Sequence, residues 1–390
     1  MPWRDVKPMD EKVLFTADYI RGGCSFTALC ARYGISRKTG YKWIHRYHQA
    51  GMEGLNERSR QPKQSPLKTP YPIRKAVIAL RKRHGSMGAK KLRVLLQQQF
   101  PNEVIPSKTT LYNILQREGL VAPRRRRQRV PPFPQPFAPA RAPNELWSAD
   151  FKGQFKTHNG IWCYPLTIMD HDSRYLLGCQ GLEGTGFIDT QTTFTRVFKE
   201  YGLPQRIRTD NGTPFASRSV GGLSRLAAWW IRLGILPERI KPGCPQQNGR
   251  HERMHRTLKQ AVAKPPAANA KVQQRCFDQF RNDYNNMRPH EALGQKPPAS
   301  CYQPSPRAFP DTLPELSYPD YYDVHTVRST GVVYWHNGQV YVSHILKGEN
   351  IGLNQVDDGI WDIYFGPVRL GGFNEREVKG HAVSYWTLKV

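Results

Sequence analysis

The sequence predicts a multi-domain protein: two N-terminal all-α helix-turn-helix domains, an α/β core with a mixed sheet, and a small C-terminal all-β, barrel-like domain. Its 390 residues exceed what a single hydrophobic core usually organises. The hydrophobic pattern changes along the chain from helical spacing to alternating strands and helices, and then to short alternating strands. A segment rich in Pro and Arg, residues 121–143, divides the helical part from the rest.

The first helix-turn-helix domain is expected within residues 1–60. Ser25 is placed to cap one helix, Gly34 allows a tight turn, and Ser36 is placed to cap a second helix. Gly40 lies inside that second helix, where Gly costs on the order of 1 kcal/mol relative to Ala, so a plain helical bundle stays open as an alternative. Leu29, Ile35 and Ile44 would face inward. The second helix would present five polar side chains to a DNA major groove: Arg37, Lys38, Thr39, Lys42 and Arg46.

A second helix-turn-helix domain is expected at residues 66–120. Helical periodicity occurs in IRKAVIALRKRHG, GAKKLRVLLQQQF and PSKTTLYNILQREGL. In the last of these, Ser107 is a cap candidate and Gly119 a stop signal. A second DNA-reading helix would therefore begin at Lys108 and Thr109.

Residues 121–143 form a linker that cannot bury a core, because its prolines hold it extended and it contains no acidic residue. We expect it to lie along DNA phosphates, while a solvated hinge is the alternative. The whole chain carries 58 Lys and Arg against 31 Asp and Glu, a formal charge of +27. Such a charge favours nucleic acid as the partner, ahead of an anionic membrane surface. The linker arginines are Arg124, Arg125, Arg126, Arg127 and Arg129.

The core is expected at residues 144–309. NELWSADFK, WCYPLTIMDHD and SRYLLGCQG read as three consecutive strands, and QRIRTD as a further short strand. Helices are expected in TQTTFTRVFKEYG, VGGLSRLAAWWIRLG, GRHERMHRTLKQAVA and VQQRCFDQFRNDYNN. A mixed sheet flanked by helices follows. Trp229 and Trp230 have the spacing of core residues, which favours packing over base stacking.

The C-terminal domain is expected at residues 317–390. VVYWHNGQVYV contains two alternating runs joined by Asn337-Gly338, a strong hairpin signal, and Asp358-Gly359 marks another turn. A barrel or curled sheet of about five strands is predicted.

Three features that the sequence lacks predict the cellular compartment of the protein. No stretch approaches the roughly 18 apolar residues of a membrane span, and the first residues have no signal-peptide run. The seven Cys are scattered without a C-x-x-C pair, which argues against disulfides and a Cys-based zinc finger. A soluble cytoplasmic protein is expected.

Three carboxylates of the core are the candidate catalytic residues. Asp150 lies on the first strand, Asp210 ends another strand before Asn211-Gly212, and Glu252 lies in the first turns of a helix opened by Asn248-Gly249. If the sheet brings them together, their mutual repulsion calls for cations between them. Oxygen ligands of this kind favour Mg²⁺ or Mn²⁺.

Two alternatives compete with this site. Asp170 and Asp172 are further carboxylates, but they fall at a strand-to-strand turn, where Asp usually bonds locally. His251-Glu252-Arg253-Met254-His255 matches H-E-x-x-H, the zinc-protease motif. The helix-turn-helix units and the basic charge do not suit a zinc protease, so we expect the two His to line the helix near DNA or to pack.

The motifs WSADF, RTDNGTPF, PGCPQQNGRHERMHRTLK and RPHEALGQKPPASCY occur in this order. They resemble the integrase core of bacterial insertion-sequence transposases of the DDE type, relatives of retroviral integrases. The resemblance implies a ribonuclease H-like core with Asp150, Asp210 and Glu252 as catalytic metal ligands. Residues 211–251 separate the second and third acids, a longer interval than the family's commonest one, so Glu252 is placed by its NGxxE motif.

The resemblance also implies a function. Two Mg²⁺ or Mn²⁺ ions per site would support cleavage at the 3′ ends of an insertion sequence and strand transfer into target DNA. The partners would be the terminal inverted repeats, the target DNA and further copies of this chain, in a bacterial, nucleoid-associated setting. A catalytically silent DNA-binding regulator is the alternative from another class.

Overall fold

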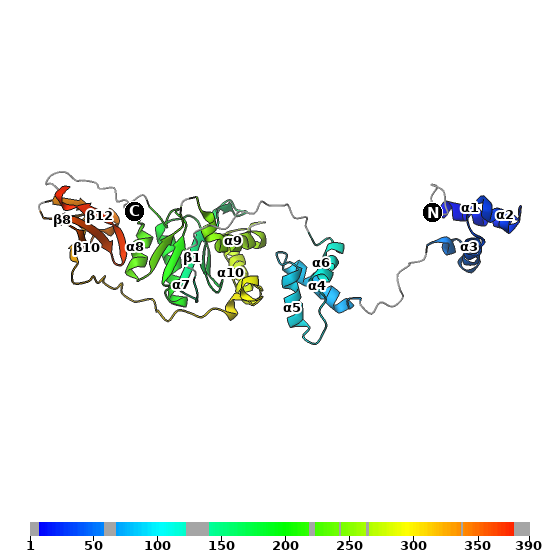
Figure 1. Cartoon of the computed structure of the whole chain (residues 1–390), viewed down its shortest axis with the longest axis horizontal. Coiled ribbons are helices and arrows are strands. Elements are labelled where there is room, and N and C mark those ends of the chain that lie inside the picture. The colour runs from blue at the N-terminus through cyan, green and yellow to red at the C-terminus, as the bar shows by residue number, and fades with distance from the viewer. Residues whose placement is uncertain are drawn as a thin grey trace. The chain divides into compact units, whose positions relative to one another are not determined.

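The computed structural model describes residues 8–57, 68–121, 140–217, 223–241, 243–262, 265–336 and 338–377. The chain divides into two compact units, Met1–Lys68 and Thr69–Val390. Figure 1 shows the elements of both, coloured by residue number. Each unit is described by itself.

The first unit is helical and contains the predicted helix-turn-helix. Ser25 and Ser36 cap the two helices as expected, since their side chains accept hydrogen bonds from the N–H groups of Ala28 and Thr39. A further helix before them was not predicted; its Phe15 is fully buried in the same small core. The elements are α1 (Pro8–Arg21), α2 (Phe26–Arg32), α3 (Arg37–Ala50) and the short 3-10 turn η1 (Gly51–Leu55).

Gly40, the residue that weakened the prediction of α3, has a packing role. A Cβ at this position would lie 2.7 Å from the Cys30 Sγ and 2.9 Å from the Phe26 ring. The lack of a side chain therefore lets α3 approach α2 closely, and the cost in helix propensity is offset by this contact.

The second unit begins with three helices around an apolar cluster that includes Val77, Leu92 and Leu111. Ser107 caps the third of them through the Thr110 N–H, as predicted. The helices are α4 (Tyr71–Arg83), α5 (Ala89–Gln99) and α6 (Lys108–Arg117). The linker arginines Arg124, Arg125, Arg126, Arg127 and Arg129 lie outside the described residues.

The α/β core is built on a mixed sheet with the order β2-β3-β1-β5-β6, and β4 pairs with β3. β1 is antiparallel to β3 and parallel to β5, and β5 is parallel to β6. The predicted strands are confirmed, while two short strands, β2 and β6, were not predicted. The strands are β1 (Leu146–Phe151), β2 (Phe155–Lys156), β3 (Trp162–Asp170), β4 (Leu176–Leu182), β5 (Arg206–Thr209) and β6 (Leu236–Arg239).

Helices cover both faces of this sheet. α7 and α8 pack with Trp147 and Ile207 in one cluster, which contains the fully buried Trp230 and confirms its predicted core position. α9 and α10 pack in a second cluster with Cys163 and Cys179 of β3 and β4. The helices are α7 (Phe187–Tyr201), α8 (Arg225–Arg232), α9 (Gly249–Val262) and α10 (Ala270–Asn286).

The C-terminal part is antiparallel β structure, as predicted. β12, β11, β10 and β7 form one sheet and β8 and β9 form a hairpin, so the strands lie in two sheets. Asp358 and Gly359 make the expected turn between β10 and β11, whereas Asn337 lies outside the described residues. The strands are β7 (Asp323–Thr326), β8 (Val332–Trp335), β9 (Gly338–Tyr341), β10 (Asn350–Asp357), β11 (Ile360–Phe365) and β12 (Val368–Asn374).

Helix α8 is shared between the core and the β domain (Figure 1). Leu226 and Trp230 point into the cluster of the core, whereas Ala227 and Ile231 belong to the cluster that also contains the β-domain strands. Arg232, at the end of α8, forms a bidentate ion pair with Glu349 at 2.7 and 2.8 Å. Among the described residues, every helix is too short or too polar to span a lipid bilayer.

Candidate active site

Asp150 and Asp210 come to the same edge of the sheet because they end neighbouring parallel strands. The register pairs Ser148 of β1 with Arg208 of β5. Each carboxylate lies two residues further along its own strand direction. Since the carboxyl ends of parallel strands meet at one edge, the two side chains are brought together there.

Glu252 reaches this edge from α9. It lies in the first turn of that helix and is exposed, while its neighbours His251 and His255 are buried against the sheet. The helix is held on β3 and β4 by Met254 and Leu258, which pack with Phe277 of α10. Asp210 and Glu252 therefore lie close enough to Asp150 for their charges to act on its carboxyl.

The pKa of Asp150 is shifted by the charges of Asp210 and Glu252. Burial, followed by the charge of Asp210 and then that of Glu252, raises the pKa of the Asp150 carboxyl to about 7. Its side chain is 19% exposed. Carboxylates that lie near one another suit a hard divalent cation, because such an ion removes their repulsion and prefers oxygen ligands. Asp150, Asp210 and Glu252 are the residues that could hold it.

The two Asn-Gly turns flank the acids. The Gly212 N–H donates to the Asp210 Oδ1 at 3.1 Å, and a Cβ at Gly212 would lie 3.1 Å from Oδ2 of the same carboxylate. The Asn211 side chain donates to the Ile240 carbonyl. Asn248 ends a 3-10 turn before Gly249 opens α9, and its buried Oδ1 has no hydrogen-bond partner within the described residues.

Asp170 behaves as the turn residue that was expected. Its carboxylate accepts from the Ser173 N–H at 2.7 Å, the Ser173 hydroxyl at 2.6 Å and the Asn144 N–H at 2.8 Å. It is fully buried, and burial raises its pKa. Asp170 thus closes the β3–β4 turn and ties it to the segment before β1.

The H-E-x-x-H motif is not arranged as a zinc-protease site. Donor atoms of Asp150, His251 and His255 lie within 4.8 Å of one another. However, both ring nitrogens of His251 lie 2.7–2.8 Å from hydroxyl oxygens of Ser148 and Thr167. From the sequence, the two His were expected either to lie near DNA or to pack, and they pack on the sheet. Glu252, which lies between them in the sequence, is exposed.

Apart from the linker arginines, which lie outside the described residues, the side chains predicted to contact DNA lie on the two helical groups. On α3, Arg37, Lys38 and Lys42 are exposed, whereas Thr39 and Arg46 are half-buried. Thr39 helps to cap the helix through a 2.9 Å contact with the Ser36 hydroxyl, and Arg46 lies over the Trp43 ring. Lys108 and Thr109, at the start of α6, are exposed.

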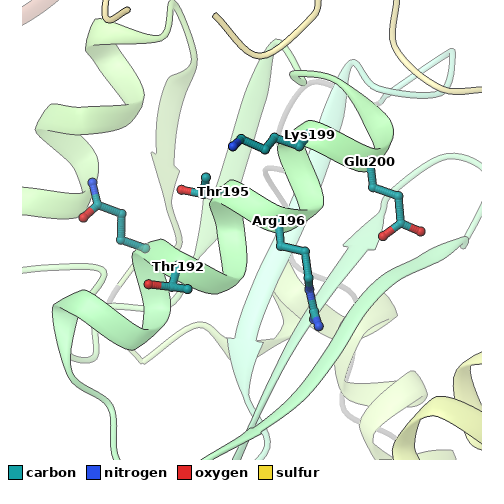
Figure 2. Close-up of a pocket in the computed structure, with 6 residues that line it drawn as sticks. Thr192, Thr195, Arg196, Lys199 and Glu200 are labelled. Carbon is teal, nitrogen blue, oxygen red and sulfur yellow. The ribbon is translucent and has the colours of Figure 1, made fainter. Parts of the chain in front are cut away.

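A separate hollow lies along the outer side of α7, away from these acids. Figure 2 shows its lining side chains projecting from that helix. They are threonine, glutamine and charged side chains, whose carbon atoms also line the hollow. It is lined by Gln191, Thr192, Thr195, Arg196, Lys199 and Glu200.

Comparison with known families matches both parts of the chain. Residues 140–245 and residues 233–298 match models of the integrase core domain. Residues 17–56 and residues 39–115 match models of homeodomain-like domains. The matches follow the order of the helical groups and the α/β core along the chain.

Two solved structures align with part of this chain. The HTLV-2 integrase catalytic core domain in complex with magnesium aligns with a TM-score of 0.34 and 16% identity, over 42% of this chain and 99% of that one. A chain of the simian T-cell lymphotropic virus intasome in complex with PP2A regulatory subunit B56 gamma aligns with a TM-score of 0.37 and 15% identity, over 75% of this chain and 97% of that one.

Curated relatives come from insertion elements and retroviruses. A 39.2 kDa protein of insertion element IS476 from Xanthomonas euvesicatoria is 27% identical over 57% of this chain and 62% of its own length. A 31.7 kDa protein of IS407 from Burkholderia multivorans is 28% identical over 48% and 66%. The chain thus spans slightly less than two thirds of each. The Gag-Pol polyprotein of baboon endogenous virus is 31% identical over 31% of this chain and 7% of its own length. Residues 140–298 of this chain therefore match the integrase core domain, and residues 17–115, ahead of them, match homeodomain-like domains.

Proposed function

We propose that this chain is a DNA transposase of the DDE type, which cuts the ends of an insertion sequence and joins them to target DNA. The observation that carries the proposal is the parallel pairing of β1 with β5, which brings Asp150 and Asp210 to one edge of the sheet. The raised pKa of Asp150 supports it, because carboxylates are gathered against their own repulsion where a cation can be held.

Asp150, Asp210 and Glu252 are the proposed ligands of two Mg²⁺ or Mn²⁺ ions. When bound, such ions lower the pKa of an attacking water and neutralise charge on the phosphodiester. The chain's own part is to fix the carboxylates: β1 and β5 are rigid strands, and Gly212 holds the Asp210 Oδ1 through its N–H. Rigid supports of this kind keep reacting groups aligned.

The proposed reaction has two displacements at one site. Water attacks the phosphorus at the element's end and displaces the 3′-oxygen, which leaves as a 3′-hydroxyl. That hydroxyl then attacks a phosphorus of the target strand and displaces a target 3′-oxygen, so one phosphodiester replaces another and no covalent enzyme intermediate forms.

Recognition of the element's ends is assigned to the helical groups. We propose that residues 1–60 and 66–120 are DNA-binding domains, with α3 and α6 as the reading helices. Exposed Arg37, Lys38, Lys42 and Lys108 supply the positive charge on these helices. Pairing of two ends would require at least two copies of the chain.

The test compares Asp150→Asn and Asp210→Asn with the unmodified protein on DNA that carries the source element's ends. Each change removes one ligand charge, so Mg²⁺-dependent cleavage and joining should fall below detection, while DNA affinity stays within about threefold. Asp172→Asn is the matched control, since this half-buried carboxylate lies at the β3–β4 turn. Nicks and joints are mapped by sequencing, and DNA affinity is measured by fluorescence anisotropy.

Two measurements, DNA cleavage and metal content, separate the competing classes of protein. Full DNA binding without cleavage in the unmodified protein would indicate a silent regulator. Stoichiometric zinc by mass spectrometry, lost in the His251→Ala, His255→Ala double variant and combined with active Asp150→Asn, would indicate a zinc hydrolase. Either result contradicts the proposed transposase.

A further inference from the structure

A buried pair of histidines lies directly behind the proposed metal ligands. His251 and His255 are one helical turn apart on α9 and face the sheet, and their rings pack edge to face with centroids 4.6 Å apart. His251 is fully buried and His255 is 6% exposed. The role inferred here for them rests on the proposed function of Asp150.

Polar groups of the sheet reach both rings. The Ser148 Oγ lies 2.8 Å from the His251 Nδ1, and the Thr167 Oγ1 lies 2.7 Å from the His251 Nε2. The same Thr167 oxygen lies 2.6 Å from the His255 Nε2. The remaining nitrogen, the His255 Nδ1, faces the Asp150 Oδ2 at 3.5 Å. The five side chains therefore form one continuous path that ends on Asp150.

The number of hydrogens limits how this path can be bonded. Both rings are buried, and a neutral imidazole carries one N–H. Each hydroxyl also has one hydrogen to donate. When Asp150 is ionised, four hydrogens thus serve four contacts, and one consistent arrangement uses all of them in one direction toward the carboxylate.

In that arrangement every group donates to the next one along the path. Ser148 donates to the His251 Nδ1, the His251 Nε2–H donates to Thr167, and Thr167 donates to the His255 Nε2. The His255 hydrogen is then on Nδ1, the ring nitrogen that lies 3.5 Å from the Asp150 Oδ2.

Two other acceptors compete for the hydroxyl hydrogens. The Met169 carbonyl lies 3.4 Å from the Ser148 Oγ, and the Asp150 carbonyl lies 3.0 Å from the Thr167 Oγ1. Both distances are longer than the 2.8 and 2.6 Å contacts with the rings. The shorter contacts favour the path toward the Asp150 carboxylate.

We infer that Ser148, His251, Thr167 and His255 form a directed hydrogen-bond chain behind Asp150, and that its last member, His255, positions the Asp150 carboxylate through the 3.5 Å contact between Nδ1 and Oδ2. The chain leaves the other carboxylate oxygen for a cation. It also fastens α9, which carries Glu252, to the strand that carries Asp150. Groups that orient a metal ligand from behind change metal affinity or activity by about 10–100-fold when they are removed.

The first experiment reads the two tautomers directly. Imidazole ¹⁵N NMR on the full-length, metal-free protein at neutral pH should show His251 protonated on Nε2 and His255 protonated on Nδ1. The signals are assigned with single His→Gln variants. If His255 instead carries its hydrogen on Nε2, Thr167 donates elsewhere and the directed chain is wrong.

The second experiment uses a pair of isosteric variants at position 255. The amide of His255→Asn reaches the place of Nδ1 and keeps a donor for Asp150, whereas the amide of His255→Gln reaches the place of Nε2 and keeps only Thr167. Mn²⁺ affinity, measured by electron paramagnetic resonance, should fall about 10–100-fold in His255→Gln and less than about threefold in His255→Asn. His344→Gln, in the β domain, is the control and should leave Mn²⁺ affinity unchanged.

Equal losses in both variants, or no loss in either, would overturn the inference, because a purely structural role does not distinguish the two amides. Melting temperatures of both are compared to exclude unfolding, and if either fails to fold, the tautomers of the unmodified protein decide. An unmodified protein that binds no Mn²⁺ contradicts the proposed function instead, while the tautomers still test the chain of hydrogen bonds.

Discussion

At the scale of single residues, the ionised Asp150 carboxylate destabilises the metal-free fold, although the proposed function requires it. Its carboxylate is largely buried, and burial together with Asp210 and Glu252 raises its pKa to about 7. An ionised Asp150 is therefore costly in the metal-free fold. Since a bound cation would neutralise this cost, the site stores free energy that favours metal binding.

Asp150→Asn should stabilise the metal-free protein at high pH. The folded pKa lies above the ordinary value of 3.8, so ionisation opposes folding, by up to roughly 4 kcal/mol above pH 7. The gain should be complete above pH 7, shrink as the pH falls from 7 toward 4, and vanish below that range, where the carboxyl is protonated in both states. Melting temperatures of Asp150→Asn and of the control Asp172→Asn, measured across this range in chelator, check it. A lower melting temperature of Asp150→Asn at pH 8 would contradict the assigned cause.

The sequence was informative for some residues of the site and silent for others. Asp150, Asp210 and the turn role of Asp170 follow from strand ends and local bonding rules. Ser148 lies two residues before Asp150 and hence on the same face of the strand, a signal that was available. Thr167 depends on the register between β1 and β3, which one sequence does not determine, so the partners of the two His were not predicted.

At the scale of elements, α3 shows how packing overrides propensity. Gly40 is buried where α3 approaches α2, and a Cβ there would meet Cys30 and Phe26 closely. Propensity measured in isolated helices does not include such a contact, so it gives the wrong sign for a substitution at this position.

Gly40→Ala should therefore destabilise the first helical unit, although Ala is the better helix former. The clash costs about 1–3 kcal/mol and the gain in propensity about 1 kcal/mol. Hydrogen exchange of the α3 amides in the full-length protein should show faster local opening. Gly23→Ala is the matched control, because no atom lies within 4 Å of a Cβ placed there. Slower hydrogen exchange of the α3 amides in Gly40→Ala would contradict this prediction. It would mean that α2 and α3 accommodate the added Cβ without a loss of stability.

Helices and strands with a clear hydrophobic periodicity were predicted from the sequence. Short strands, and a helix with a weakly apolar face, were missed. Strands β1, β3 and β4 and helices α7, α9 and α10 have clear periodicity. β6, Leu236–Arg239, has the sequence LPER, which lacks alternation, and becomes a strand only by pairing with β5. α1 has a weakly apolar face, so tertiary contacts of Phe15 define it more than its own pattern does.

At the scale of the whole molecule, charge and order of domains dominate. The formal charge of +27 is concentrated in a chain with few acidic residues, and such a chain attracts a polyanion over its length. The homeodomain-like matches lie ahead of the integrase core, which suits a protein that first binds DNA and then presents it to a catalytic site.

A fragment of residues 1–143 should bind the element's end without the rest of the chain. If it neutralises 6–10 phosphates, its affinity should fall by roughly 10³–10⁵ between about 50 mM and about 200 mM salt. Anisotropy titrations with end DNA and with a shuffled sequence of equal length measure both affinity and preference. Equal affinity for the two DNAs would refute the assignment of end recognition to this region.

Helix α8 has a consequence for how such a protein survives in a cell. One side of it completes the core and the other side completes the β domain, through Ala227 and Ile231. We expect that a gene truncated before the β domain would not encode a smaller stable protein. It would encode a core with an uncovered apolar wall, a form that quality-control proteases recognise and remove. A frameshift late in the gene would therefore silence the protein by turnover, even with every proposed catalytic residue intact.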